Sequence, residues 1–309
     1  MIAAGPRPSG VLIVNPGAGR SSAARRLEVV SAVRERFRVE VYETPARDAG
    51  IDIAAHAAAA GAAAVIAFGG DGLVNEVANG VAGTPTSLAI IPGGTMNVFA
   101  RALGIPVDPM DAVEALERRW DATRTVSLGR MDERLFTFSA GCGFDAEAAG
   151  RVERDFRSKR TFGELFFYWS AVRVLAGSYR RRNPSMALRG PFGEVPVAMA
   201  IGCNAGPYAY LAGRAVNLAP DVRLDGGLDV FALKGMRIET LPFYAWRAVV
   251  SGDFVHHPDA FYANDLEGFE VSSDEPFARH VDGEPLPPAS SARFSIAPDV
   301  LKVKGAVEG

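Results

Sequence analysis

At 309 residues, the chain is long enough for two domains or one large one, since domains commonly hold about 100–200 residues. Hydrophobic residues make up 48% of it and charged residues 22%, which excludes a disordered or fibrous chain. The net charge is only −3, so a generic nucleic-acid binder is also excluded and no nucleic-acid partner is expected.

Short apolar runs alternate with helical patterns in the N-terminal part of the chain. Strands are expected at 11–15, 39–44, 64–68 and 88–91. Five helices are expected between and after them: one that begins at about 21, one that ends at about 60, one that ends at 81, one that begins at about 96, and one over 108–119. Strict alternation of this kind is typical of a parallel sheet with helices on its faces. The sequence therefore predicts an N-terminal α/β domain with a doubly wound parallel sheet.

The pattern changes after Trp120. Strand-like runs separated by Gly, Pro and Asp turns follow at 125–130, 134–140, 185–189, 195–202, 228–233, 269–273, 277–283 and 293–297. Two helical stretches, at about 161–181 and 238–250, interrupt them. This pattern predicts a mainly antiparallel β-sandwich C-terminal domain with added helices.

The domain boundary is expected between Arg119 and Leu135. We therefore assign 1–130 to a nucleotide-binding domain and 131–296 to a β-rich lipid-substrate domain, and the tail of about 297–309 is a candidate to pack back on the first. Cys142 and Cys203 are too few for a disulfide scaffold, and no run approaches the ~18 apolar residues that cross a membrane. A cytoplasmic location is expected.

The most informative motif is AFGGDGLVNEVANGV at 67–81. Glycines between a strand and a helix let the backbone approach a ligand, and the free N–H groups of the helix start attract phosphate. A carboxylate at Asp71 would repel that phosphate unless a cation stood between them, which favours Mg²⁺-nucleotide chemistry. The alternative is a glycine-rich turn in which Asp71 caps the helix.

Two more glycine loops leave strands of the same predicted sheet, NPGAGR at 15–20 and IPGGTMN at 91–97. The carboxyl ends of parallel strands meet at one edge, so the three loops are expected to line a single crevice.

These motifs together resemble the soluble diacylglycerol/sphingosine lipid kinase family, whose nucleotide half is similar to that of NAD kinases. AGCGFDAE (140–147), VRLDGGLDV (222–230) and HVDGEPL (280–286) follow in the order that the family has. The resemblance implies that ATP is held by the glycine loops and the end of the second strand. The residues concerned are Asn15, Pro16, Gly17, Ala18, Gly19, Thr44, Gly70, Asp71, Gly72, Leu73, Asn75, Glu76 and Thr95.

The resemblance also implies a structural Mg²⁺ in the second domain, bound by the backbone carbonyls of Val222 and Gly227 and the carboxylate of Asp225. The residues alone fit a surface turn stabilised by Asp225 and Asp229 equally well.

The proton acceptor is expected in HVDGEPL, because a hydroxyl that attacks a γ-phosphate needs a carboxylate within hydrogen-bond reach. Asp282 and Glu284 flank a glycine, and strand alternation would place both carboxylates on one side. We favour Glu284 as the base and keep Asp282 as base or metal relay, with Asp71 as the third catalytic residue, acting through Mg²⁺. Without the resemblance, such a turn is more typical of a solvated hairpin.

Three positions differ from many members of the family. Leu73 stands where many have Thr, although sphingosine kinases also have leucine there, and Ser127 and Val98 stand where Asp is common. These differences keep open a non-catalytic nucleotide- or lipid-binding sensor.

Residues 151–182 hold nine Arg and Lys against three Asp and Glu around an aromatic run. Basic and aromatic residues together suit peripheral docking on anionic lipid, whereas the helical spacing of the aromatics equally fits a helix packed on its own core.

The sequence thus predicts an ATP- and Mg²⁺-dependent lipid kinase of phospholipid biosynthesis, peripheral to the inner membrane face, with diacylglycerol as the first candidate acceptor and phosphatidate as product. The alternative enzyme is a kinase of a soluble acceptor such as NAD, and a homodimer is left open. The kinase prediction requires the glycine loops of the N-terminal half to face the carboxylate of the C-terminal half.

Overall fold

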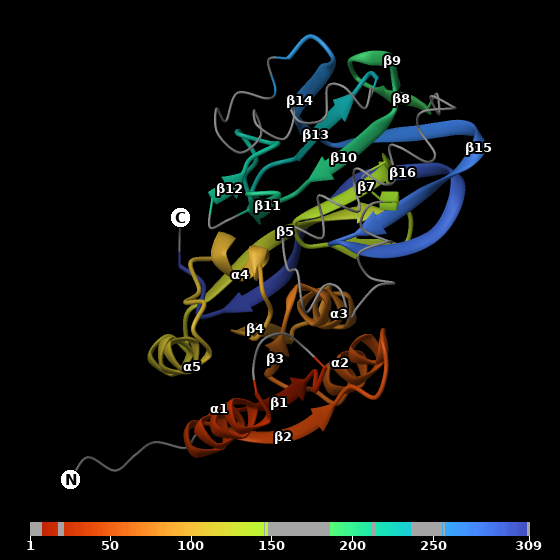
Figure 1. Cartoon of the computed structure of the whole chain (residues 1–309). Coiled ribbons are helices and arrows are strands. Elements are labelled where there is room, and N and C mark those ends of the chain that lie inside the picture. Colours follow the sequence, from red (N-terminus) through yellow and green to blue (C-terminus); the bar gives the residue numbers. More distant parts are fainter. Residues whose placement is uncertain are drawn as a thin grey trace. The chain divides into compact units, whose positions relative to one another are not determined.

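The computed structural model describes residues 8–17, 22–144, 146–147, 186–211, 214–235, 255 and 257–307 (Figure 1). The chain divides into two compact units, one of 1–127 with 298–309 and one of 128–297. The helices expected at about 161–181 and 238–250, and the basic segment 151–182, lie outside the described residues.

The first unit is built on four parallel strands. They are β1 (Ser9–Val14), β2 (Arg38–Glu43), β3 (Ala64–Gly69) and β4 (Ser87–Pro92), paired in the order β2-β1-β3-β4. Every residue of β3 and β4 is buried, which explains their continuous apolar sequence, since a strand covered on both faces has no polar side.

Helices cover both faces of this sheet (Figure 1). They are α1 (Ala23–Arg36), α2 (Ala49–Ala59), α3 (Asp71–Val81), the short α4 (Val98–Ala102) and α5 (Pro109–Arg118). One core joins α1 and α5 to the face of β1 and β3 that carries Leu12, Ile66 and Phe68. Because strand side chains alternate, the opposite face of these strands meets α2 and α3. The unit is therefore a doubly wound α/β domain, as predicted.

The C-terminal residues of the chain complete the first unit. Val303 pairs in parallel with Leu88 of β4. Three further contacts hold the tail: the Gly305 N–H donates to the Ala122 carbonyl at 3.0 Å, the Val307 N–H donates to the Leu103 carbonyl at 3.1 Å, and Lys304 Nζ donates to the Trp120 carbonyl at 2.9 Å.

The second unit is built from antiparallel strands. They are β5 (Thr123–Met131), β6 (Arg134–Phe136), β7 (Ser139–Gly143), β8 (Met186–Gly190), β9 (Gly193–Val197), β10 (Met199–Cys203), β11 (Ala209–Leu211), β12 (Arg214–Val216), β13 (Leu228–Leu233), β14 (Ala260–Leu266), β15 (Gly268–Val281) and β16 (Glu284–Lys304). β5 and β16 each contribute residues to both units. The main core contains Phe269 stacked on Phe294, with ring centroids 4.4 Å apart. This unit is the predicted antiparallel β-sandwich.

The strand predictions differ from the structure in detail. The run 134–140 forms two strands, β6 and β7, because the backbone N–H groups of Thr137 and Phe138 donate to the Asp282 side chain instead of joining a ladder. The runs 269–273 and 277–283 form one strand, β15, which ends at Val281. β14 was not predicted, because Asn264 and Asp265 are poor strand formers.

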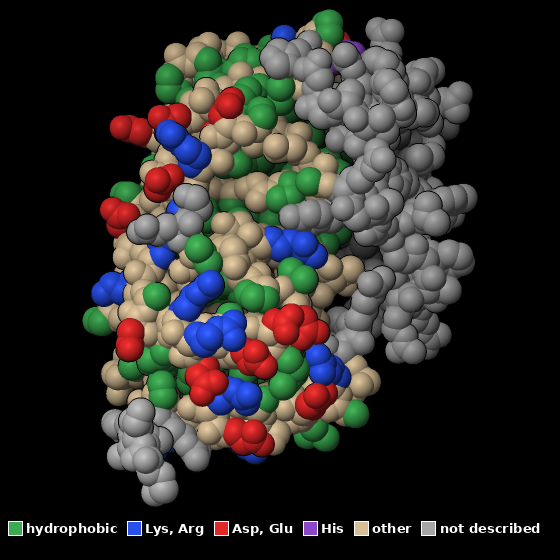
Figure 2. Space-filling model, turned by 90° about the vertical axis from the view of Figure 1, so that its left-hand side faces the viewer, with side chains coloured by type: hydrophobic (Ala, Val, Ile, Leu, Met, Phe, Trp, Pro, Cys, Tyr) green, Lys and Arg blue, Asp and Glu red, His purple; other side chains and the backbone are tan. Residues whose placement is uncertain are grey.

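Charges of both signs are interspersed among the described side chains on the face drawn in Figure 2. On α1 and α5, Arg25 pairs with Glu28 and Asp108, and Arg36 pairs with Glu117. No helix of the described residues is both long and apolar enough to cross a membrane.

Candidate functional site

The loops that follow the four parallel strands begin side by side. The Asn15 N–H donates to the Phe68 carbonyl at 3.2 Å, the Thr44 N–H to the Val14 carbonyl at 3.0 Å, and the Gly93 N–H to the Gly69 carbonyl at 2.7 Å. The strand order reverses between β1 and β3, and such a switch point is where open α/β sheets bind ligands. The first unit therefore brings together the three glycine loops and Thr44.

Two of these loops touch through glycine backbone. A Cβ added to Gly94 would lie 2.6 Å from the Cα of Gly70, and one added to Gly70 would lie 3.3 Å from the Cα of Gly94. The first distance is too short for any Cβ, and the second is tight. Glycine is therefore required at position 94 by contact with the backbone of Gly70, and not by its own backbone conformation.

The start of α3 is suited to binding an anion. Its N-cap residue is Gly70, which provides no side-chain cap, and Asp71 is the first residue of the helix and not its N-cap. Asp71 and Gly72 are both half-buried. The N–H groups and the positive dipole end of this first turn provide the attraction for phosphate.

Side chains of the other two loops fix the loop backbone. Asn15 Oδ1 accepts the Gly17 N–H at 2.9 Å. Asn97, buried and with a positive φ of 49°, accepts the Gly94 N–H and donates to the Gly94 carbonyl, each at 3.0 Å. Thr95 is exposed, whereas Ala18 and Gly19 lie outside the described residues.

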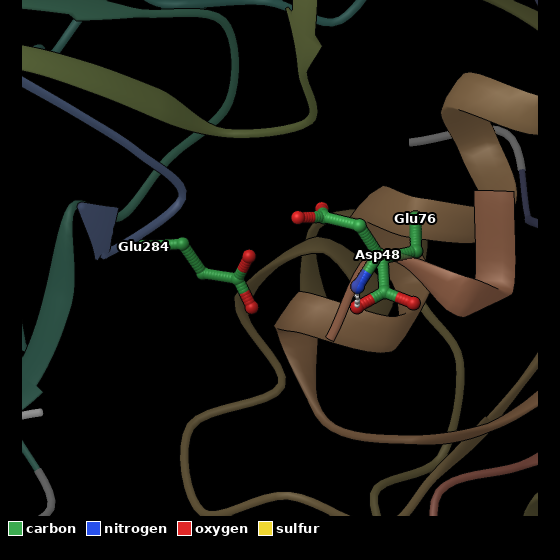
Figure 3. A group of neighbouring side chains, drawn as sticks. All are labelled: Asp48, Glu76 and Glu284. Carbon is green, nitrogen blue, oxygen red and sulfur yellow. Dashed lines mark hydrogen bonds between the residues drawn. The ribbon is translucent and has the colours of Figure 1, made fainter. Parts of the chain in front are cut away.

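Four residues that the resemblance assigns to ATP have buried side chains in the first unit: Thr44, Leu73, Asn75 and Glu76. Asn75 Oδ1 accepts from Asn79 at 3.1 Å. Glu76 accepts the backbone N–H of Asp48 at 3.0 Å (Figure 3) and that of Gly50 at 2.8 Å. The side chains of Asn75 and Glu76 thus hold the local structure around the loops.

The positions at which the chain departs from the family pattern also pack inside the first unit. Leu73 lies against Gly50 and Gly69, with its Cδ1 and Cδ2 at 3.1 and 2.8 Å from a Cβ built at these glycines. Val98 is fully buried. Ser127 Oγ accepts the Asp299 N–H at 3.2 Å. Leu73 and Val98 serve packing, and Ser127 ties β5 to the C-terminal tail.

The second unit places Asp282 in a hairpin turn between β15 and β16. Asp282 and Gly283 have φ values of 49° and 81°, and Val281 pairs with Glu284 across the turn. Positive φ at both central residues defines a type I′ turn, for which Asp-Gly is a preferred sequence. The expectation that strand alternation puts both carboxylates on one side is therefore wrong, because Asp282 belongs to the turn and not to a strand.

The Asp282 carboxylate is buried and accepts four hydrogen bonds. Oδ2 accepts from the N–H and the hydroxyl of Thr137 at 2.7 and 2.8 Å, and Oδ1 accepts the N–H groups of Phe138 and Ser139, each at 3.0 Å. Burial raises the pKa of Asp282, while these donors act in the opposite direction. Both oxygens are thus engaged inside the unit, and the turn is anchored to the start of β7.

Glu284 differs from Asp282 in exposure. It is the first residue of β16 and half-buried, and Figure 3 draws its extended side chain. The anchored turn fixes its backbone through the pair with Val281.

The loop that the resemblance assigns to a metal precedes β13. Asp225 is exposed, and the described residues form no hydrogen bond or ion pair with its carboxylate. Gly227 is required, since an added Cβ would lie 2.7 Å from the Leu266 carbonyl oxygen, and its N–H donates to Asp265 Oδ1 at 2.8 Å. Carboxylate and carbonyl oxygens are the donors that Mg²⁺ takes, so the residues fit such an ion.

Sequence reasoning missed the residues that support this loop. Tyr262 of β14 donates to the buried carboxylate of Asp229, and the other oxygen of Asp229 accepts the Asp265 N–H at 3.1 Å. Burial raises the pKa of Asp229, while the Tyr262 hydrogen bond opposes it. Because β14 was not recognised as a strand, the sequence carried no signal that would join Tyr262 to the loop.

A doubly wound unit with glycine turns at its strand ends, followed by an antiparallel sandwich with an acidic hairpin, defines a class of two-domain kinases. The sequence comparison agrees: residues 9–131 match the diacylglycerol kinase catalytic domain, and residues 139–305 match the YegS C-terminal NAD kinase β-sandwich-like domain. The chain belongs to the diacylglycerol kinase/YegS family of lipid kinases.

Relatives from several bacteria are similar over most of their length. A protein named "Probable lipid kinase YegS-like" from Pseudomonas aeruginosa is 32% identical over 259 residues, 81% of this chain and 79% of that one. A "Diacylglycerol kinase" from Staphylococcus haemolyticus is 29% identical over 279 residues, 88% of this chain and 81% of that one. A crystal structure of a diacylglycerol kinase from Bacillus anthracis has a TM-score of 0.73 at 22% identity, covering 96% of both chains, and so shares the fold.

Proposed function

We propose that this protein transfers the γ-phosphoryl group of ATP to a lipid hydroxyl in a Mg²⁺-dependent reaction, with diacylglycerol as the acceptor and phosphatidate as the product. The observation that carries the proposal is the backbone contact between Gly70 and Gly94 beside the first turn of α3, whose N-cap residue is a glycine. Backbone N–H groups brought together at a helix start suit a polyphosphate. The Staphylococcus relative named diacylglycerol kinase supports the choice of acceptor.

The first unit would hold the nucleotide. The turn of Gly70 and Gly72 cradles the phosphates, the loops held by Asn15 and Asn97 flank them, and Asp71 contributes its carboxylate to the cation that accompanies ATP. Mg²⁺, when bound, supplies neutralisation of the negative charge on the phosphates. Positioning and charge neutralisation are the main requirements of phosphoryl transfer, so no further covalent chemistry is needed.

The second unit would supply the base. A base must accept a proton, and Asp282 already accepts four hydrogen bonds from Thr137, Phe138 and Ser139. Glu284 is more exposed and its backbone is fixed by the same hairpin. We therefore assign proton acceptance to Glu284 and a supporting role to Asp282.

The loop of Val222, Asp225 and Gly227 would hold a structural Mg²⁺ in the second unit. Its role is to keep the segment between β12 and β13 in place, since the loop offers oxygen ligands but lies in a segment with few backbone hydrogen bonds of its own. Thermal unfolding with and without Mg²⁺ measures that contribution.

The proposal is tested with γ-labelled ATP and vesicles that contain diacylglycerol. Asp71→Asn and Glu284→Gln are each expected to lower transfer by a factor of at least about 100, which is the size of a lost general base or metal contact. Both variants are expected to unfold at the wild-type temperature. Glu133→Gln, an exposed glutamate of the second unit, is the control and is expected to retain full activity.

The same assay separates the alternatives. Transfer to NAD without vesicles would replace the lipid by a soluble acceptor, and ATP binding without transfer to any acceptor would point to a sensor. Wild-type turnover in Glu284→Gln would remove the assignment of the base.

We further propose that the protein meets its substrate at the cytoplasmic membrane surface, with the basic segment 151–182 as the contact. The support is its charge, nine basic against three acidic residues in a chain of net charge −3. Binding to anionic vesicles that weakens with added salt is the expected result, and equal binding to neutral vesicles would contradict the proposal.

A further inference from the structure

The N-terminus of α2 is capped by a residue from another helix. Asp48 occupies the N-cap position with a positive φ of 63° and makes no side-chain cap to the helix. Its backbone N–H donates to Glu76 Oε1 at 3.0 Å, and the Gly50 N–H donates to Glu76 Oε2 at 2.8 Å (Figure 3). Glu76 lies on α3 and is 5% exposed. Its carboxylate therefore replaces the missing cap of α2 from inside the unit.

This arrangement depends on the residue at position 50. A Cβ added to Gly50 would lie 2.4 Å from Glu76 Oε2, 3.1 Å from Glu76 Cβ and 3.1 Å from Leu73 Cδ1. Any larger residue would push the carboxylate away from the N–H groups. The glycine at position 50 and the carboxylate of Glu76 thus depend on each other. The local sequence around either residue gives no sign of this contact.

The capped segment is the loop between β2 and α2. The N-terminal end of this loop is fixed by the Thr44 N–H, which donates to the Val14 carbonyl at 3.0 Å. Its C-terminal end is fixed by Glu76 through Asp48 and Gly50. Thr44, the residue that the family resemblance assigns to ATP, therefore lies in a segment held at both ends.

The contacts of Glu76 with the N–H groups of Asp48 and Gly50 also distinguish the starts of α2 and α3 as binding sites for phosphate. Two oxygens with negative charge already satisfy N–H groups at the positive end of α2, where an anion would otherwise bind. The start of α3 has only Gly70 as its N-cap and no side-chain cap. The Glu76 carboxylate therefore disfavours a phosphate at the start of α2, whereas the start of α3 is left for a phosphate that arrives with its cation, which Asp71 of the first turn requires.

In doubly wound nucleotide-binding sheets, the residue that bonds the ribose follows the first glycine loop and its helix, which is where the end of β2 and Thr44 lie in this chain. We propose that Glu76 is a positioning residue, which holds the β2–α2 loop in the conformation that receives the nucleoside part of ATP, and that it does not itself contact the phosphates. The inference rests on the proposed ATP-dependent function. It assigns Glu76 to the nucleotide site through Thr44 and the loop, whereas a ligand role would require oxygens that Glu76 already uses within the unit.

Two variants remove the cap in different ways. Glu76→Gln places an amide nitrogen against one of the two N–H donors, and Gly50→Ala displaces the intact carboxylate. Both are expected to weaken ATP binding about tenfold, as loss of a charge-assisted hydrogen bond would, and to leave the affinity for inorganic tripolyphosphate within about twofold of the wild type. Combined, they are expected to cost no more than either alone, because they break the same contact.

Two control variants match these changes. Glu133→Gln alters an exposed glutamate, and Gly235→Ala adds a Cβ that has no atom of the described residues within 4 Å, so neither is expected to change ATP affinity. Hydrogen exchange of the Asp48 and Gly50 amides provides a readout without nucleotide. Faster exchange at these amides in both variants, with the β3 amides still protected, is expected.

Equal weakening of ATP and tripolyphosphate in Glu76→Gln, with Gly50→Ala unaffected, would overturn the proposal and make Glu76 a phosphate-site ligand. Unchanged amide exchange in both variants would also overturn it. Failure of the wild type to bind ATP would remove the proposed function, and the amide exchange would then still show whether Glu76 holds the loop.

Discussion

The two units differ in what lies against a cluster of backbone N–H groups. In the first unit, the N–H groups at the start of α3 have only a glycine as N-cap, and neighbouring loops approach them through Gly94. In the second unit, the consecutive N–H groups of Thr137, Phe138 and Ser139 surround an anion that the chain itself provides, Asp282. The comparison teaches that the second unit uses an internal anion to fix the residue beside it, whereas the proposed function gives the N–H groups of the first unit an external one.

The largest expected effect is the loss of stability when the internal anion, the Asp282 carboxylate, is removed. Asp282→Asn replaces one acceptor oxygen by a donor that faces backbone N–H groups, and it should lower the free energy of unfolding by about 3 kcal/mol. Chemical unfolding measures the change in the free energy of unfolding, and hydrogen exchange of the native protein shows whether the amides of β7 lose protection. Asp274→Asn, at an exposed position of β15, is the control, and an equal loss in both variants would contradict the special role of Asp282.

Replacing Leu73 by threonine, the residue that many family members have, should lower the free energy of unfolding of the first unit. Leu73→Thr shortens a buried side chain, 2% exposed, that packs between Gly50 and Gly69, so a loss of about 2 kcal/mol is expected. Turnover should not rise. Leu27→Thr, whose side chain is 72% exposed, is the control and should stay within about 0.5 kcal/mol. Higher activity in Leu73→Thr would show that a hydroxyl is missing from the site.

The proposed anion site of the first unit is tested at the contact between the glycine loops. Gly94→Ala puts a Cβ 2.6 Å from the Cα of Gly70, which forces the loops apart and should weaken ATP binding at least about tenfold. Calorimetric titration with ATP measures the affinity, and Gly235→Ala is the matched control. Unchanged ATP affinity in Gly94→Ala would show that the contact has no part in binding.

The smallest expected effect concerns a surface cap. Asp108 caps α5 by accepting the N–H groups of Met110 and Asp111. Desolvation alone would raise its pKa, but these N–H groups and Arg25 outweigh it and leave the pKa below the ordinary 3.8. A lowered folded-state pKa gives stability that is present above the unfolded pKa and lost as the pH falls through the folded value.

Asp108→Ala should therefore cost about 1 kcal/mol at neutral pH, and the difference from wild type should vanish in acid, below the lowered pKa. Thermal unfolding over a range of pH checks this. A difference that persists in acid would mean that Asp108 acts by packing and not by its charge.

The sequence was informative where structure follows from neighbouring residues. The buried strands β3 and β4 and the glycine turn at Gly70 could be predicted, because apolar runs and strand-to-helix glycines are local patterns. The β-sandwich could be predicted as a class from its short runs and turns. Strand ends and the extra strand β14 could not, because tertiary contacts decide them.

The supporting contacts could not be predicted for the same reason. Thr137 and Asp282 are 145 residues apart in the chain, and Gly50 and Glu76 are 26 apart. No periodicity or motif joins such pairs. The resemblance to lipid kinases named Asp282 and Glu76 as members of the site, but only the contacts show which atoms they hold.

The return of residues 298–307 to the first unit bears on how the protein is made. The edge of β4 pairs with Val303, so a ribosome has to translate the whole second unit before that edge is covered. Synthesis of the first unit thus begins before that of the second unit and is finished after it, because residues 128–297 lie between its two parts in the sequence. A circularly permuted gene that encodes these residues ahead of β1 would make the first unit contiguous and let it fold before its partner is translated.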